Sequence, residues 1–149
     1  MDKYYWGKEL PEPYAPSHKD VEIYVQNLKS GSTLLLGCTH KLIPYSDFQM
    51  DIDPWYEAPT VIVDDWRNNK SFYTNIMGDG VFNFTEELTN DVLHMASKCS
   101  DILAIRCFNK KLPNMKVASY FPKQEDFSIK VNYSYSFKDY NFFIWKFNV

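Results

Sequence analysis

Apolar and polar residues alternate without interruption from residue 127 to residue 138, and this pattern constrains the fold more than any other feature of the chain. Successive side chains of a strand point to opposite faces of a sheet, so a period of two indicates a strand with one covered face. Residues 139–141 permit a turn, and residues 142–149 supply a second apolar face. We therefore expect an antiparallel hairpin over 127–149.

The rest of the chain carries short apolar runs without alternation, each followed by polar, glycine or proline residues. Runs of this kind are typical of parallel strands that are covered on both faces. The predicted strands are 33–38, 48–51, 60–63, 72–77 and 101–108.

Two segments show the apolar period of a helix. The first begins after Ser17, which can cap it together with Asp20, and should end near Gly31. The second should begin at Thr85 and lead into the strand at 101–108. Strands alternating with helices, followed by a terminal hairpin, predict an α/β domain with three layers and a mostly parallel sheet ending in antiparallel strands.

Length and composition limit the domain organisation and the location. At 149 residues, with 11 Phe, 11 Tyr and 4 Trp, the chain should form one domain over 1–149, in which the proline-containing residues 1–16 are an extended arm. No apolar stretch approaches a membrane span, and the first residues do not resemble a secretion signal. We expect a soluble, cytoplasmic protein that does not bind membranes.

Charge and the possible metal ligands argue against two further classes. A net charge of −3 makes nucleic acid an unlikely partner. Three cysteines without CxxC spacing, and histidines far apart at 18, 40 and 94, predict neither a disulfide framework nor a metal site. We expect reduced, mostly buried thiols, and ordinary packing for His94 beside the apolar face of its helix.

The loops that follow the first four strands are unusually polar. They comprise residues 37–41, 51–55, 64–67 and 78–83, and each carries a glycine or an acid. Ligands of open α/β sheets gather at the carboxyl ends of the strands, and a carboxylate after the second strand can accept both hydroxyls of a ribose. The loops thus predict a site for an adenosine-containing ligand, and their acidity argues against a polyphosphate.

Structural explanations for the same residues stay open. Asp51 and Asp53 could cap a helical turn, Asp64 and Asp65 could form a solvated turn, and Gly78-Asp79-Gly80 could be turn chemistry alone.

In order and spacing the loops resemble the class I S-adenosylmethionine (SAM)-dependent methyltransferases, in particular small, phage-like or minimal members. Residues 34–42, Leu-Leu-Leu-Gly-Cys-Thr-His-Lys-Leu, resemble a variant of their first motif, and 51–54, Asp-Ile-Asp-Pro, resemble the motif after the second strand. Residues 63–67 and 77–83 resemble the third and fourth motifs. The match covers roughly residues 17–109 and implies a three-layer, Rossmann-like methyltransferase fold with SAM as cofactor.

The resemblance also implies which residues contact SAM. It assigns the methionine part to Gly37, Cys38 and Thr39, the ribose to Asp51 with Ile52 beside it, and the adenine to Asp65 and Trp66. It assigns the amino-acid end to Asp79 and Gly80, and Trp6 folds over the cofactor. Asp79 could instead act as a general base, so the catalytic residues stay unknown.

Three functions follow from these observations. The leading one is a SAM-dependent methyltransferase with an unknown acceptor. The alternative is a non-catalytic SAM-binding or regulatory protein that completes its site with a partner, because no insertion forms a lid and little room exists for a helix between Phe108 and Phe127. A dehydrogenase would need G-x-G-x-x-G, and only Gly37 is present. The hairpin offers a surface for a homo-oligomer.

Overall fold

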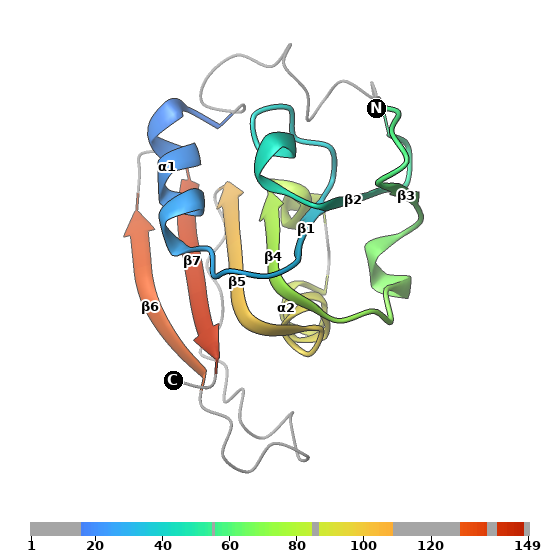
Figure 1. Cartoon of the computed structure of the whole chain (residues 1–149). Coiled ribbons are helices and arrows are strands. Elements are labelled where there is room, and N and C mark those ends of the chain that lie inside the picture. The colour runs from blue at the N-terminus through green and yellow to red at the C-terminus, as the bar shows by residue number, and fades with distance from the viewer. Residues whose placement is uncertain (1–15, 55, 85–86, 109–128, 137–139, 148–149) are drawn as a thin grey trace.

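The computed structural model of the chain describes residues 16–54, 56–84, 87–108, 129–136 and 140–147 (Figure 1). The α-helices are α1 (His18–Asn27) and α2 (Leu88–Ala96), and the short 3₁₀ helices are η1 (Ile43–Tyr45), η2 (Trp66–Asn68) and η3 (Val81–Phe84). The strands are β1 (Thr33–Leu36), β2 (Phe48–Asp51), β3 (Val61–Val63), β4 (Tyr73–Asp79), β5 (Cys99–Phe108), β6 (Ile129–Ser136) and β7 (Tyr140–Phe147).

All seven strands form one sheet in the order β3-β2-β1-β4-β5-β7-β6. The first five pair in parallel, whereas β7 pairs antiparallel with both β5 and β6. The order reverses between β1 and β4, because the chain leaves β1 toward β2 and β3 and then returns to the other side of β1. The predicted fold class, a mostly parallel sheet that ends in a C-terminal antiparallel hairpin, is confirmed.

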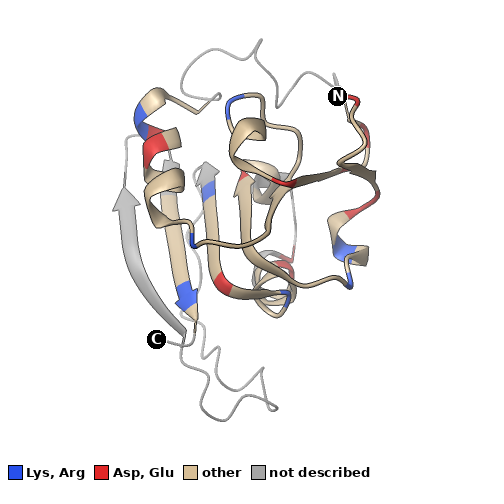
Figure 2. Cartoon of the chain, in the orientation of Figure 1, with Lys and Arg blue, Asp and Glu red and all other residues tan. Residues whose placement is uncertain are grey.

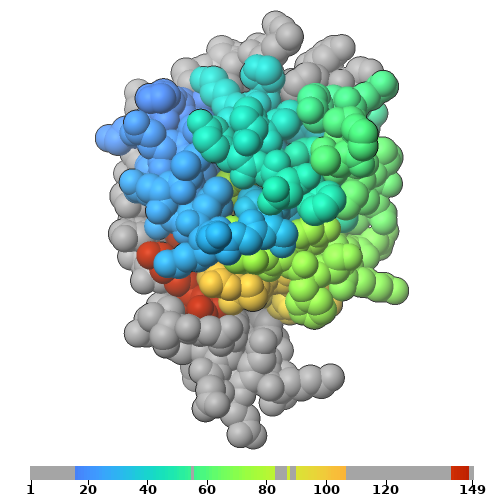
Figure 3. Space-filling model, in the orientation of Figure 1, coloured from blue at the N-terminus to red at the C-terminus, as the bar shows by residue number. Residues whose placement is uncertain are grey.

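The two α-helices cover opposite faces of the sheet (Figure 1). On one face Tyr24 of α1 packs in a cluster with Leu35 of β1 and Ile144 of β7. On the other face Val92 of α2 packs with Leu34 and its neighbours. Side chains of successive strand residues alternate between faces, which explains why the whole of β1 is buried and why its sequence shows no polar alternation. In Figure 3 the blue atoms of α1 and the residues after it cover the nearer face.

The first helix begins as the sequence predicts. The Ser17 hydroxyl accepts from the Asp20 amide at 3.1 Å, and the Asp20 carboxylate accepts from the Ser17 amide at 2.9 Å. This reciprocal pair is a capping box, which satisfies two backbone donors that the first turn leaves without partners. The helix ends at Asn27, before the predicted end near Gly31.

Other boundaries differ from the prediction as well, and β1, β3 and β4 differ from their predicted ranges by one or two residues. The predicted start of the second helix at Thr85 is wrong: α2 begins at Leu88, and Glu87 takes the N-cap position without a side-chain cap bond. Val92 and Met95 are buried on its apolar face, whereas Cys99, which the helical pattern placed on the same face, lies beyond the helix and is buried at the start of β5. The strand predicted from residue 101 begins at Cys99. Short 3₁₀ helices follow β1, β3 and β4.

Some predictions fall outside the described residues, namely the arm over 1–15, Trp55, and the segment 109–128. Cys38 and Cys99 are free and buried. In the part of the chain that the structure describes, no helix is long and apolar enough to cross a membrane. That same part contains no group of three or more histidines, cysteines or acids able to hold a metal ion.

Candidate functional site

The loops that the sequence singles out leave the sheet along one edge. Leu36 of β1 lies opposite Met50 of β2 on one side and Gly78 of β4 on the other. The residues that come next, Gly37, Asp51 and Asp79, therefore stand at the same level on three adjacent strands. Figure 2 shows acidic residues at the ends of β2 and β4. This edge includes the point where the strand order reverses, which is where ligands of open α/β sheets bind.

Gly37 makes the turn out of β1. Its φ of +81° lies in the left-handed region that favours glycine, and a Cβ here would lie 3.1 Å from Val81 Cγ1. Its amide donates to the carbonyl of Met50 at 2.7 Å, which holds the turn against the end of β2. Both the backbone conformation and the lack of space therefore require glycine at this position.

The two residues after Gly37 are buried. Cys38 is 0% exposed, and burial together with the charge of Asp51 raises the pKa of its thiol to about 12, so it is not a thiolate at neutral pH. Thr39 is 1% exposed, and its Oγ1 has no hydrogen-bond partner among the described residues. Buried hydroxyls are almost always hydrogen-bonded, so an unpartnered one in a strand-end loop points to a ligand or water that completes it.

Asp51 links the first two loops. Its Oδ2 accepts from the Cys38 amide at 3.1 Å, and its Oδ1 accepts from the Asp53 amide at 3.1 Å. The side chain is half-buried, and each carboxylate oxygen has room for a second donor. These bonds fix the carboxylate beside the loop after Gly37 while leaving acceptor capacity, which is what recognition of a vicinal diol requires. Ile52, the next residue, is 70% exposed.

Asp65 and Trp66 lie at the start of η2. The Asp65 carboxylate caps this turn by accepting from the Arg67 amide at 2.9 Å, so its capping role is present in the structure. The half-buried ring of Trp66 packs on Phe82 at 5.0 Å between centroids, and the Arg67 guanidinium lies 4.7 Å from the Trp66 centroid. The contact with Phe82 holds the indole against η3, which follows β4 at the same edge of the sheet.

Asp79 lies within a buried network of hydrogen bonds. It is 1% exposed, and its two oxygens accept from Arg106 Nε at 2.7 Å and Nη2 at 3.0 Å. The Tyr24 hydroxyl donates to Asp79 Oδ1 at 2.8 Å, and Arg106 Nη1 donates to Asp20 Oδ2 at 2.8 Å. Asp79 Oδ1 already has two donors and the side chain is 1% exposed, so an ammonium group or a substrate proton has little access to the Asp79 carboxylate.

The network joins α1 to β4 and β5 and places two carboxylates around one guanidinium. Burial raises the pKa of Asp79, although the charge and hydrogen bonds of Arg106 and the bond from Tyr24 act in the opposite direction. Burial alone would lower the pKa of Arg106, but the charges of Asp79, Tyr24 and Asp20 raise it overall. Gly80 follows with a φ of +77°, and its amide donates to the Arg106 carbonyl at 2.9 Å.

Arg106, Asp20 and Tyr24 were not predicted as site residues, and Asp20 was expected only as part of the cap of α1. One signal was available, because Arg106 interrupts an apolar strand that is covered on both faces. A charged residue in such a strand must be paired, and this requirement would have directed attention to an acid on a neighbouring element. Of the other predicted contacts, Trp6 lies outside the described residues.

Comparison with known proteins identifies the class of fold. No protein-family model and no curated protein matches the chain. Among solved structures, the magnesium protoporphyrin IX methyltransferase of Synechocystis PCC 6803 with bound SAM aligns with a TM-score of 0.57 at 17% identity, covering 86% of this chain and 78% of that one. The N-methyltransferase NodS of Bradyrhizobium japonicum WM9, in complex with S-adenosyl-L-homocysteine (SAH), gives 0.58 at 10% identity, covering 99% and 96%.

A third similar structure is a putative methyltransferase in complex with the Trm112 methyltransferase activator of Haloferax volcanii. It aligns with a TM-score of 0.56 at 9% identity and covers 86% of each chain. The chain thus has the Rossmann-like fold of SAM-dependent methyltransferases, as the sequence resemblance predicts.

Proposed function

We propose that the protein is a SAM-dependent methyltransferase with its cofactor at the carboxyl edge of β1 and β2. One observation carries the proposal: the glycine turn at Gly37, the Asp51 carboxylate and the unpartnered Thr39 hydroxyl converge in a fold shared with methyltransferases that bind SAM or SAH. The residues present fit the cofactor, because they offer a carboxylate for a diol and a buried polar atom that lacks a partner.

Each proposed contact has a distinct task. Asp51 would accept from the ribose hydroxyls, and Gly37 lets the backbone approach the ligand closely. Cys38 and Thr39 would border the methionine part, and Asp65, Trp66 and Ile52 the adenosine part. SAM supplies an already activated methyl group, so the chain has mainly to orient an acceptor and exclude water. Gly80 and Trp6 complete the proposed set.

The contacts of Asp79 favour a positioning role for this residue. Its carboxylate binds Arg106, and Arg106 also binds Asp20 of α1, so these bonds hold the end of β4 to β5 and α1. We propose that Asp79 acts on the cofactor through this arrangement of the edge. A general base that acts directly on the acceptor would need a carboxylate that accepts fewer hydrogen bonds from the protein.

Calorimetric titration with SAM tests the proposal. Asp51→Ala should weaken binding by about 1–3 kcal/mol, because the ribose hydroxyls lose their acceptor. Asp53→Ala is the matched control, since it removes the same charge two residues away and keeps the amide that donates to Asp51. Equal affinities of the two folded variants would contradict the assignment of Asp51.

The second function, a SAM-binding protein that completes its site with a partner, is favoured by the surface around β2 and β3. Ile52 and Val63 are 70% and 68% exposed, and the only helix described between β2 and β4 is the short η2. A similar methyltransferase was solved in complex with an activator. SAH production in the presence of candidate acceptors distinguishes the two functions, and SAM binding without turnover, alone and with cell extract, favours the second.

Location and partners belong to the same proposal. Buried free thiols at Cys38 and Cys99 fit a reducing compartment, and we propose the cytoplasm. The net charge of −3 supports an acceptor other than nucleic acid. The edge position of β6 supports a homo-oligomer through the hairpin, which sedimentation velocity would detect.

A further inference from the structure

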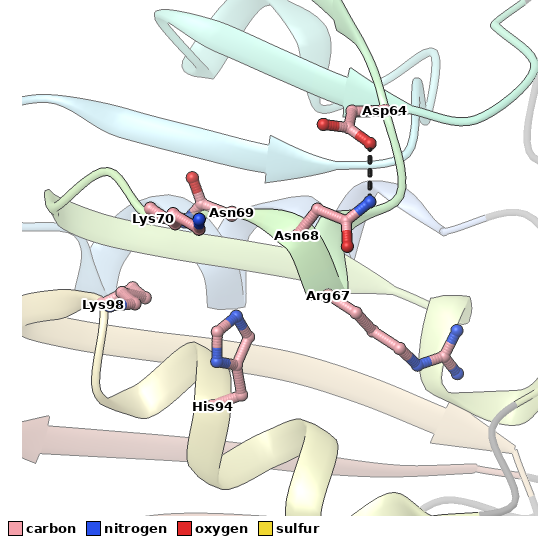
Figure 4. A pocket seen from close by; sticks show the side chains of 7 residues that line it. All are labelled: Asp64, Arg67, Asn68, Asn69, Lys70, His94 and Lys98. Carbon is pink, nitrogen blue, oxygen red and sulfur yellow. Dashed lines mark hydrogen bonds between the residues drawn. The ribbon is translucent and has the colours of Figure 1, made fainter.

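A pocket of about 850 Å³ lies between the segment that carries η2 and the C-terminal half of α2 (Figure 4). None of the residues proposed to contact SAM lines it. It is open to solvent, because Asp64, Arg67, Asn68 and Lys70 of its lining are exposed. The side chains around it are mostly polar or charged, so its chemistry can be derived from their contacts.

Two lysines define one end of the pocket. Figure 4 shows Lys70 and Lys98 on the same side of His94. Among the described residues no carboxylate forms an ion pair with either ammonium group. Lys98 Nζ lies 4.9 Å from the centroid of the Phe72 ring, a contact that leaves its charge unneutralised. This end of the pocket is therefore positive and lacks a counter-charge.

His94 stands between the two ends. Its ring extends from α2 toward Asn68 (Figure 4), and its Nε2 is buried without a hydrogen-bond partner among the described residues. A buried ring nitrogen normally has a partner, so its lack of one here is a second sign of a ligand. The ordinary packing expected for His94 does not account for this nitrogen.

The other end of the pocket is acidic. Asp64 Oδ1 accepts from the Asp65 amide at 2.7 Å and from Asn68 Nδ2 at 3.0 Å. Within the described part of the chain, Asp64 Oδ2 accepts no hydrogen bond. Arg67 is nearby, but it pairs with Asp91 at 3.2 Å and with Asp65 at 3.5 Å, so its charge is largely neutralised. Free acceptor capacity is thus left at this end.

We propose that this pocket binds a small phosphorylated compound that carries hydroxyl groups, of the size of a sugar phosphate. Lys70 and Lys98 bind the phosphate beside the His94 ring, since ammonium groups act on phosphate as point charges with rotatable donors. Asp64 Oδ2 accepts from a hydroxyl group of the ligand. The separation of a positive and an acidic end favours this ligand over inorganic phosphate alone.

A purely structural role explains only part of the cluster. The partial negative charge at the C-terminus of α2 stabilises cations there, which accounts for His94 and Lys98. Lys70 lies outside the helix, on the chain between η2 and β4, and brings a further positive charge to the same pocket. The helix dipole explains neither Lys70 nor the unpartnered Nε2.

Titration of the full chain with ribose 5-phosphate, inorganic phosphate and ribose tests the proposal. We expect saturable binding of ribose 5-phosphate, weaker binding of phosphate and none of ribose. The double variant Lys70→Gln/Lys98→Gln should lose at least about tenfold in affinity for ribose 5-phosphate. Asp64→Asn should weaken ribose 5-phosphate and leave phosphate unchanged.

The matched control is Lys19→Gln/Lys29→Gln, which removes the same charge from exposed positions in α1 and in the segment that follows it. Its affinity for ribose 5-phosphate should equal that of the unaltered chain, and all variants should keep the same unfolding temperature. SAM affinity should also stay constant, which separates this site from the cofactor site. The proposal is overturned if ribose 5-phosphate does not bind, if both lysine pairs have the same effect, or if phosphate binds as tightly as ribose 5-phosphate.

Discussion

Asp51 is the last residue of β2 and Asp79 the last residue of β4, the two strands that flank β1, yet the surroundings of the two carboxylates differ. Asp51 is half-buried, and among the described residues its carboxylate accepts from two backbone amides, those of Cys38 and Asp53. Asp79 is 1% exposed and accepts from a guanidinium and a phenol. A carboxylate that faces neutral donors keeps acceptor capacity for a ligand, whereas one that faces a buried cation is committed to the fold.

The largest effect on stability is expected at Arg106, the buried cation that binds Asp79. Arg106→Met should lower the free energy of unfolding by about 3–5 kcal/mol, because it leaves Asp79 and Asp20 buried without their counter-charge. Urea denaturation measures the change. Arg67→Met is the comparison, since its side chain is 48% exposed while that of its partner Asp91 is 8% exposed, and its loss should cost less than that of Arg106, which is buried with both of its partners.

If Arg106→Met does not fold, the triple variant that adds Asp20→Asn and Asp79→Asn remains informative. It removes the two uncompensated charges and should recover part of the lost stability. Similar losses for Arg106→Met and Arg67→Met would show that the buried network contributes no more than a surface pair.

Substitution of the two aspartates should rank in opposite order for stability and for SAM affinity. Asp79→Asn should lower the free energy of unfolding by about 2–3 kcal/mol, whereas Asp51→Asn should cost about 1 kcal/mol or less, because an amide oxygen can still accept from the Cys38 amide. For SAM affinity the ranking should reverse, with Asp51→Asn the weaker binder. Denaturation and calorimetry on the same two proteins measure both quantities. If Asp79→Asn instead lost more SAM affinity than Asp51→Asn at unchanged stability, a direct contact of Asp79 with the ammonium group of SAM would be supported.

The difference between these two regions also marks what could be predicted from sequence. Local patterns were sufficient for the capping box at Ser17, the buried strand β1 and the hairpin, because each depends on neighbours in the chain. The end of each strand could be located to within about two residues, which placed Gly37, Asp51 and Asp79 on one edge.

The partner of each carboxylate could not be predicted from local sequence. Arg106 is separated from Asp79 by 27 residues and from Asp20 by 86, so their contact depends on strand order and on the placement of α1. For the same reason Asp51 and Asp79 were both predicted as ligand contacts, without a distinction between them. The two aspartates are distinguished by the side chains that contact them in the folded chain, and residue spacing in the sequence does not predict these contacts.

A smaller effect should follow from removing a single neutral donor. Tyr24→Phe deletes the hydroxyl that donates to Asp79 Oδ1, while Arg106 still binds both oxygens. The free energy of unfolding should fall by about 1.5–3 kcal/mol, the usual range for a hydrogen bond to a charged group. Thermal or urea denaturation measures it, with Tyr45→Phe, at a 46% exposed position, as the control. An unchanged free energy of unfolding in Tyr24→Phe would mean that the bonds from Arg106 alone stabilise the buried Asp79 carboxylate.

An effect that is absent at neutral pH should appear at alkaline pH, in the loop that Asp51 holds. Burial and the charge of Asp51 raise the pKa of the Cys38 thiol from 9.0 to about 12, so the folded chain keeps this proton at pH values where the unfolded chain releases it. Stability from this group is therefore complete below about pH 9 and is lost as the pH rises toward 12. Cys38→Ala should flatten the decline in the free energy of unfolding over this interval, while Cys38→Ala/Asp51→Asn should behave like Cys38→Ala alone. If the free energy of unfolding of Cys38→Ala declined as steeply with pH as that of the unaltered chain, the raised pKa of the Cys38 thiol would not be the cause of the decline. The electrostatic description of this region would then be wrong.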